Sequence, residues 1–565
     1  MNLATKAWLL AHILRWRLTW DKRNTGACQR VPGNPKFMSA REAVKLIPDG
    51  ATLGVAGFAA SMRSSILYWA IREQFEATGH PNNLTAITLG GSGGRGRIPG
   101  TMEELGLPGL LKRFITGHAE TYKTLLRLTD RGEIEFHCLP LGVLVQVVGG
   151  MDHGENSIIT DTGIGTFVDP RTGRGTPIVG DHAQLVEVVE ERLKFTLPPV
   201  EATVFNAPSA DREGNIYWKN AALVADTVAM ARAARRNGGP VIANVGRIVE
   251  KGHGEILLSA SEVDAVVVWK GTEQTASIPH RRHWDCFTLE SKASMAESIA
   301  RVRFVNQTLG ITPRRKPVDD ALARLTASVF VEHAHKGDFV DIGIGLPEEV
   351  SRLLFKSGAM RDITLLTESG VFGGLPTPGI FFGAAVNPEE IISSKEAFER
   401  IYKRLDAAIL GALEIDSEGN NNVSYRGEGA INYVGPGGFI DLSTCAKHVI
   451  FCCAWGAGAD LRIERGKMRV VNPGKPKFVE RVSEVTFSGP EALKRGKDVF
   501  YVTHVGAFRL TARGMELFRV MPGIDVQKDI IEQCPMRVVL PEDGKVQVVE
   551  DSIVTGKGFR LEFKK

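Results

Sequence analysis

One carboxylate stands at the end of an apolar run and in a glycine-rich turn. Residues 363–376 read ITLLTESGVFGGLP, so a strand-like segment ends at Glu368. A carboxylate can act as a general base, a metal ligand or a nucleophile. A metal would need more ligands, and no His or Cys lies nearby in the sequence. As a nucleophile, Glu368 would need a pocket that holds an activated acyl group and donors for the developing oxyanion. Taken alone, this position favours a solvated turn residue.

A second glycine cluster supplies the type of donor that such a nucleophile needs. Residues 428–442 read EGAINYVGPGGFIDL, with Gly435, Gly437 and Gly438 around Pro436. Glycines let the backbone approach a ligand closely, and consecutive N–H groups can form an oxyanion hole. A tight turn before a helix or strand explains the cluster equally well.

A third glycine cluster invites two interpretations. Residues 89–100 read LGGSGGRGRIPG, and GGSGG formally matches the elbow that presents a nucleophilic serine. That elbow requires a helix directly after the serine, whereas more glycines and Pro99 follow Ser92. A glycine loop over a ligand, with Arg95 and Arg97 near a phosphate, fits better than a serine nucleophile.

Strand-like and helix-like segments alternate along the chain. The segments PVIANVGRIV, VDAVVVW, HVIFCCAW and RVVLPE predict strands, and VADTVAMARAARRNG and DDALARLTASVFVEHAHKG predict helices. This alternation predicts an α/β fold with mostly parallel, doubly wound sheets. Such sheets bind ligands at the carboxyl ends of their strands, which is where Glu368 is expected.

The chain repeats one pattern. Ile47 and Ala334 each begin a segment with a turning glycine, a short strand, a glycine-rich bend and an amphipathic helix; DREGNIYW at 211–218 matches DSEGNNNV at 416–423. The distance between the two landmarks is about 80 residues longer in the first half. We therefore expect two tandem related α/β domains, over residues 38–307 and 321–565, joined by a linker at 308–320. Residues 1–37 are basic, Trp-rich and unlike the rest, and we expect a disordered extension or a start codon assigned too far upstream.

Composition limits the partners. The 565 residues are 43% hydrophobic and 24% charged, with a net charge of +4. So small a net charge argues against nucleic acid, and no run approaches the ~20 apolar residues of a membrane span. The seven cysteines form no C-x-x-C motif, which argues against a structural zinc site and a disulfide scaffold and favours reduced thiols in a cytoplasmic enzyme.

Several motifs in a fixed order resemble one family. ESG, GGLP, FGAAVNPEEII, DSEGNNNVS, GPGGFIDL and AKHVIFC closely resemble family I coenzyme A (CoA) transferases, above all the propionate and acetate CoA-transferases and then the acyl-CoA:3-ketoacid transferases. The first half shares the resemblance in EATGHPNNLTAITLGGSGGRGR, GLLKRFITGH, GEIEFHCLPLG, GTFVDPR and DREGNIYW. It runs from about Met38 to the C-terminus. Single-chain members of that family look like two fused subunits, which fits the repeat.

The resemblance implies a mechanism and its residues. Glu368 would attack an acyl-CoA thioester, giving an acyl–glutamyl anhydride. The released CoA would then convert the anhydride into a glutamyl–CoA thioester, and a second carboxylate would run the same steps in reverse. It implies no metal and no cofactor beyond CoA as a substrate, and a homodimer or homotetramer in short-chain fatty acid or ketone body metabolism. The oxyanion and CoA-binding candidates are Gly435, Gly437 and Gly438. The substrate-pocket candidates are Gly57, Phe58, Gly343, Gly345 and Asn387.

One position departs from the family. Family members have P-Q-G after a strand of the first half, where the Gln side chain helps to form the oxyanion hole, whereas this chain has LPLG with Leu141 at that position. Loss of one such donor can cost on the order of 10²-fold in rate. Gln146 lies nearby in sequence and is expected to face elsewhere. The alternatives to a transferase are an acyl-CoA hydrolase on the same scaffold and a CoA-binding protein with little turnover.

Overall fold

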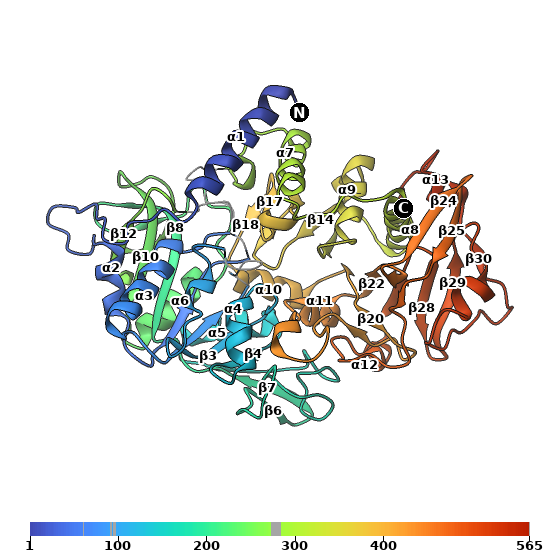
Figure 1. The fold of residues 1–565 in the computed structure, drawn as a ribbon, viewed down its shortest axis with the longest axis horizontal. Coiled ribbons are helices and arrows are strands. Elements are labelled where there is room, and N and C mark those ends of the chain that lie inside the picture. Colours follow the sequence, from blue (N-terminus) through green and yellow to red (C-terminus); the bar gives the residue numbers. More distant parts are fainter. Residues whose placement is uncertain (60, 91–92, 94–97, 273–283, 564–565) are drawn as a thin grey trace.

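The molecule is built around two β-sheets. Its structure is a computed structural model that describes residues 1–59, 61–90, 93, 98–272 and 284–563. The first sheet comes from the first half of the chain and the second from the other half (Figure 1). Parallel strands dominate both sheets, and helices connect them. The predicted α/β class with mostly parallel sheets is confirmed.

The first sheet holds parallel strands in the order β12-β10-β8-β1-β2-β3-β4, and the short β9 and β11 add antiparallel pairs beyond β8. Its strands are β1 (Thr52–Val55), β2 (Leu84–Thr88), β3 (Leu111–Thr116), β4 (Glu135–Cys138), β8 (Ala202–Asp211), β9 (Ile216–Tyr217), β10 (Val241–Val249), β11 (Ile256–Leu258) and β12 (Ala265–Val268). The helices of this half are α2 (Ala40–Ala43), α3 (Ser65–Thr78), α4 (Lys123–Asp130), α5 (Leu141–Met151) and α6 (Thr227–Arg236). A separate small sheet contains β5 (Ser157–Thr160), β6 (Val186–Val189) and β7 (Arg192–Thr196).

The second sheet has a parallel centre in the order β27-β22-β19-β13-β14, with antiparallel pairs at both sides. Its strands are β13 (Asp338–Ile342), β14 (Ile363–Leu366), β15 (Val371–Phe372), β18 (Glu390–Ile391), β19 (Ala407–Leu410), β22 (His448–Cys452), β27 (Asp498–Val502), β28 (Gly506–Thr511), β29 (Gly514–Val520) and β30 (Gln547–Val548). The helices are α7 (Met295–Thr308), α8 (Pro317–His333), α9 (Glu348–Ser357), α10 (Ser394–Lys403), α11 (Phe439–Cys445), α12 (Gly489–Lys494) and α13 (Asp551–Thr555). Short two-stranded sheets pair β16 (Leu375–Pro376) with β17 (Ala385–Val386), β20 (Glu414–Ile415) with β21 (Asn421–Asn422), β23 (Gly456–Ala457) with β26 (Lys475–Pro476), and β24 (Asp460–Glu464) with β25 (Lys467–Asn472).

The two halves share their central topology. The order β12-β10-β8-β1-β2 in the first sheet corresponds, strand for strand along the chain, to β27-β22-β19-β13-β14 in the second. The matching turns also agree, because the side chains of Asp211 and Asp416 each accept hydrogen bonds from the backbone of their own turn. In both turns the glycine has a positive φ, +99° at Gly214 and +77° at Gly419, which favours glycine there. The first half is longer because β3, β4 and the small sheet lie between β2 and β8.

We expected a disordered N-terminal segment, but the structure contains a helix there. Helix α1 (Leu3–Thr19) buries Leu9, Ile13 and Trp16 in a hydrophobic cluster with residues of α7, while Leu10, Leu14 and Leu18 of the same helix are exposed. Figure 1 shows α1 and α7 side by side. The expected linker at 308–320 is partly helical, since α8 begins at Pro317, and the domain boundaries themselves stay predictions.

Three of the four strands predicted above from β-rich segments form, as β10, β12 and β22, and both predicted helices form, as α6 and α8. The fourth strand prediction, RVVLPE, was wrong: only Val539 forms an isolated bridge, to Glu516. Pro541, which lacks an N–H donor, disfavours a longer strand in this segment. All seven cysteines are free. Among the described residues, no helix has the length and apolar character needed to cross a bilayer.

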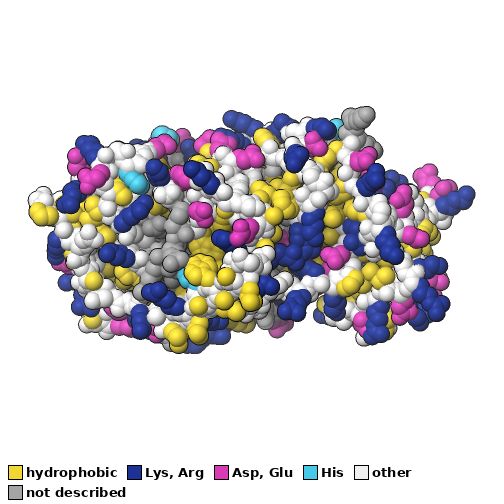
Figure 2. Space-filling view, turned by 90° about the horizontal axis from the view of Figure 1, so that it is seen from above, with side chains coloured by type: hydrophobic (Ala, Val, Ile, Leu, Met, Phe, Trp, Pro, Cys, Tyr) yellow, Lys and Arg dark blue, Asp and Glu magenta, His cyan; other side chains and the backbone are white. Residues whose placement is uncertain are grey.

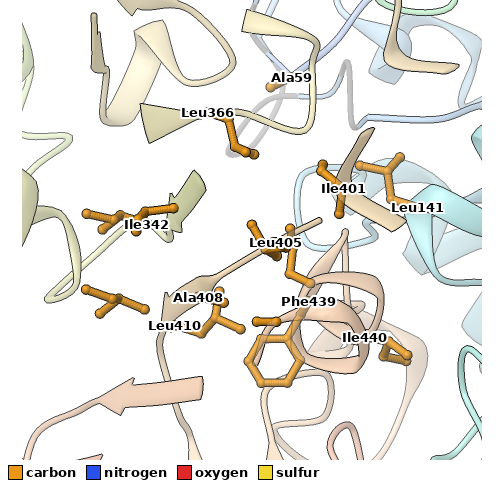
Figure 3. Close-up of a cluster of buried hydrophobic side chains, with 14 of the residues drawn as sticks. Ala59, Leu141, Ile342, Leu366, Ile401, Leu405, Ala408, Leu410, Phe439 and Ile440 are labelled. Atoms are coloured by element: carbon orange, nitrogen blue, oxygen red, sulfur yellow. The ribbon is translucent and has the colours of Figure 1, made fainter. Parts of the chain in front are cut away.

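One hydrophobic core runs through both halves. Figure 3 shows buried side chains from the first half, at Ala59 and Leu141, together with buried side chains of the second half such as Leu366, Ile401 and Phe439. Because this core is shared, the ends of strands from both halves are held in fixed positions relative to each other.

Candidate active site

Glu368 follows β14 by two residues, in a turn that hydrogen bonds hold in place. The Gly370 N–H donates to Thr367 O at 3.0 Å, and the Thr367 N–H donates to Val371 O at 2.9 Å. The Ser369 hydroxyl donates to Gly383 O at 2.5 Å. Gly370 has a φ of +95°, and a Cβ there would lie 2.2 Å from Ile392 O, so only glycine fits. The turn therefore presents Glu368 in one position at the carboxyl end of β14, as predicted.

The second glycine cluster packs directly on this carboxylate. A Cβ at Gly438 would lie 2.5 Å from Glu368 Cδ, and the nearby Gly438 N–H lowers the pKa of the Glu368 carboxyl. Gly438 has a φ of −86°, which any residue can adopt. Glycine is therefore required at 438 for space and not for its backbone conformation.

The first half of the chain holds the glycine loop. The Gly437 N–H donates to Gly117 O at 2.7 Å, just beyond β3, and the Leu141 N–H donates to Gly437 O at 2.9 Å, at the start of α5. Gly435 lies against Cys138, where a Cβ would approach Sγ to 2.7 Å. The nucleophile candidate and its donor thus come from the second half, but the first half positions the donor.

Two more carboxyl groups lie near Glu368. Loss of water raises its pKa well above the usual range, and the nearby charges of Asp341 and then Asp441 raise it further, while the Gly438 N–H lowers it. Burial raises the pKa of Asp341 to about 7 and that of Asp441 to about 7. Asp441 accepts hydrogen bonds from the Gly142 N–H at 2.9 Å and the Tyr402 hydroxyl at 2.8 Å. A cluster of carboxyl groups with shifted pKa values is typical of an active site.

Comparison with known proteins identifies the family. The family model for coenzyme A transferase matches residues 37–267. Caffeate CoA-transferase of Acetobacterium woodii is 32% identical over 523 residues, which cover 90% of this chain and 96% of that protein. Acetate CoA-transferase YdiF of Escherichia coli K12 is 31% identical over 548 residues, covering 94% of this chain and 98% of the relative. The chain belongs to the coenzyme A transferase family.

A solved structure agrees with this assignment. The acyl-CoA transferase YdiF of E. coli O157:H7, described as a thioester complex with CoA, has a TM-score of 0.80 and 27% identity over 93% of this chain and 98% of its own. The protein described here is thus a CoA-transferase enzyme that shares the YdiF fold.

The pocket residues expected in this CoA-transferase lie in different surroundings. The Gly57 N–H donates to Asp226 at 3.2 Å, and the Phe58 ring lies 6.2 Å from that of Phe382, in the loop whose Gly383 O accepts from Ser369. Phe58 therefore contacts the loop beside the Glu368 turn, whereas the Gly57 N–H is bound within the first half.

The second-half candidates differ from one another. Gly343 follows β13, and its N–H donates to Ile409 O at 2.9 Å. Gly345 is exposed, has a φ of +93°, and accepts from Arg315 at 2.5 Å. The Asn387 side chain is held by Ala293, because its Nδ2 donates to Ala293 O at 2.8 Å. A role for these residues in substrate binding stays a prediction.

Other predictions concern side chains that the site does not include. Gln146 faces away as expected, donating to Lys395 O at 3.2 Å. Ser92, Arg95 and Arg97 lie outside the described residues. Leu141 is 1% exposed and packs in the shared core.

A group that could hold a metal lies at the opposite edge of the second sheet. His333, His448 and Asp498 place ligand atoms within 4.8 Å of one another. His448 and Asp498 begin β22 and β27, whereas Glu368 follows the end of the parallel β14. A metal bound there would lie at the opposite end of the strands from Glu368.

Sequence reasoning missed Asp341, Asp441, Tyr402 and Asp226. Asp341 sits inside the apolar strand VDIGIG, and a lone carboxylate in a buried strand is itself a signal. Burial likewise raises the pKa of Asp226 to about 7. Asp441 belongs to the GPGGFIDL motif, three residues after Gly438.

Proposed function

We propose that this CoA-transferase moves CoA between short-chain carboxylic acids, such as acetate, propionate or 3-keto acids, with Glu368 as the nucleophile of a ping-pong reaction. The contact that carries this proposal is the one between the Glu368 carboxylate and the Gly438 backbone. It puts an N–H donor beside the group that would form each acyl bond. The names of the acetate and caffeate relatives support carboxylates as substrates.

Each step of the proposed reaction conserves the acyl-transfer energy. A Glu368 oxygen attacks the thioester carbon, the C–S bond breaks, and CoA leaves as the thiolate with an acyl–glutamyl anhydride in place. The thiolate then attacks the Glu368 carbonyl carbon, and the first carboxylate leaves. The second carboxylate attacks the glutamyl–CoA thioester and reverses both steps, so no ATP is consumed.

Burial shapes the nucleophile in this scheme. A carboxylate with a raised pKa is a stronger base and nucleophile than one in water, provided that it is ionised when the thioester arrives. The Gly438 N–H lowers the pKa of Glu368 and so favours the ionised form. The same N–H can donate to the oxygen that becomes negative when the Glu368 carbonyl is attacked.

Positive charge on one face of the molecule suits the phosphate groups of CoA. Figure 2 shows Lys and Arg side chains gathered in the hollowed middle of the face seen from above. CoA carries phosphate groups, which Arg and Lys bind favourably. Binding energy from this distant part of CoA can be used at the reacting thioester.

A trapping experiment tests the proposal. We expect wild-type protein incubated with acyl-CoA alone, and then reduced with borohydride, to carry an alcohol in place of the Glu368 carboxyl, visible by mass spectrometry of the peptide containing residues 363–376. Acetate or propionate added before reduction should release a new acyl-CoA. Glu368→Gln should give neither product. Free CoA without any new acyl-CoA would instead indicate hydrolysis, and the absence of any adduct in the wild type would refute the mechanism.

A further inference from the structure

Asp341 is a buried carboxyl beside the nucleophile. It lies in β13 and is 6% exposed. The register pairs it with Leu366 of β14, so both side chains lie on the same face of the sheet, and Glu368 follows Leu366 by two residues. The effect of the Asp341 charge on the pKa of Glu368 exceeds that of Asp441. Of these two carboxyl groups, Asp341 therefore has the larger electrostatic effect on Glu368.

The surroundings offer Asp341 no other partner. In the part of the chain that the structure describes, no hydrogen bond or ion pair engages its side chain, whereas the Asp441 carboxylate on α11 receives the Gly142 N–H and the Tyr402 hydroxyl of α10. The titratable groups that face the pair are Asp441 and, behind it, Tyr402. No Lys or Arg of the described residues contributes to the charge around Asp341. Two buried carboxylates without a cation cannot both be ionised at low cost.

We propose that Asp341 is a positioning residue that carries a proton and donates it in a hydrogen bond to the Glu368 carboxylate, which fixes one oxygen and leaves the other free to attack. This inference rests on the proposed role of Glu368. In the active state, Asp341 and Glu368 share one proton. Asp341 thereby adds a second donor to the Gly438 N–H at a site where Leu141 offers no side-chain donor.

The shared proton predicts two limits to activity. Below the first ionisation of the pair, both carboxyls are protonated and Glu368 cannot attack. Above the second, both are ionised, the donor is lost, and the negative charge repels the incoming carboxylate substrate. Since the two groups interact, the limits belong to the pair and not to either residue. The pH profile of kcat/KM should therefore be bell-shaped.

Substitutions of Asp341 separate this role from a structural one. Asp341→Asn keeps a donor but cannot ionise, so we expect the alkaline limb of the profile to disappear and the acid limb to remain, with a loss of less than about tenfold in kcat. Asp341→Leu loses the donor as well, and kcat should fall by on the order of 10²-fold. Asp338→Asn is the matched control, because Asp338 is on the same strand and is also 6% exposed, but it binds the His335 N–H at 2.7 Å and not the nucleophile. Its alkaline limb should match that of the wild type.

Infrared spectroscopy tests the proton without relying on turnover. The difference spectrum between wild type and Asp341→Asn near neutral pH should contain the carbonyl stretch of a protonated carboxylic acid, which disappears as the pH is raised through the alkaline limb. Absence of that band, or an alkaline limb that persists in Asp341→Asn, overturns the inference. If the borohydride trap finds no adduct in the wild type, the proposed function fails, and the infrared band still decides whether the two carboxyls share a proton.

Discussion

At Glu368 the chemistry depends on a balance between burial and ionisation. Burial and the charges of Asp341 and Asp441 disfavour the carboxylate, whereas the Gly438 N–H favours it. A fully solvated glutamate would ionise more easily but would be a weaker nucleophile, and the water around it could hydrolyse the proposed thioester intermediate. The ionised form of Glu368 therefore depends on the number of hydrogen-bond donors that compensate for its buried charge.

A substitution at Leu141 can add a hydrogen-bond donor near the proposed oxyanion site. We expect Leu141→Gln to raise kcat for transfer by about tenfold or more, because an amide N–H beside the glycine loop could donate to the oxyanion. The free energy of unfolding should fall, since a polar group replaces an apolar side chain that is 1% exposed. Steady-state transfer between acyl-CoA and acetate measures the first effect and thermal melting the second. Leu141→Met is the control; an equal rate in both variants would show that position 141 does not reach the reacting atoms.

The sequence predicted the position of Glu368 better than its surroundings. The strand before Glu368 and the glycines of GPGG are local signals, so their position at the end of β14 and their conformation could be predicted. Asp341 meets Glu368 only because β13 and β14 pair in one particular register, which no local pattern specifies. Helix α1 was missed for a similar reason, since its buried side depends on α7, far along the chain.

At the scale of elements, the loop 435–438 works through close backbone approach. We expect Gly438→Ala to abolish the borohydride-trapped adduct while the protein stays folded, because the new Cβ would overlap the Glu368 carboxyl. Gly437→Ala is the matched comparison: no heavy atom lies within 4 Å of its Cβ, but its φ of +55° disfavours alanine. That variant should lose about 1–2 kcal/mol of stability and retain adduct formation. Mass spectrometry and thermal melting of both variants check the pair; an adduct in Gly438→Ala would contradict the close contact.

At the scale of the whole molecule, the first half supports the loop beside Glu368, the proposed nucleophile, which belongs to the second half. Besides the contacts of Gly117 and Leu141 with the loop, Arg174 forms an ion pair with Glu484 at 2.8 Å, and Arg426 one with Glu120 at 2.6 Å. The repeat places two similar sheets in one chain, and the strands β3 and β4 that only the first half has end where the glycine loop docks. The extra length of the first half thus contributes directly to the position of the proposed oxyanion donors.

Asp130 tests whether this support matters for catalysis. At the end of α4, its carboxylate accepts from the Ala430 N–H at 2.5 Å and the Ile431 N–H at 3.1 Å, upstream of the glycine loop. Loss of about 1 kcal/mol of loop ordering in Asp130→Ala corresponds to roughly fivefold in rate. We expect kcat to fall by about that factor with little change in KM for acyl-CoA, since Asp130 is not among the proposed substrate-pocket residues. Asp152→Ala, an equally polar change after α5, should leave kcat unchanged. A melting temperature that falls in Asp130→Ala while kcat stays constant would mean that the loop is ordered by Gly117 and Leu141 alone.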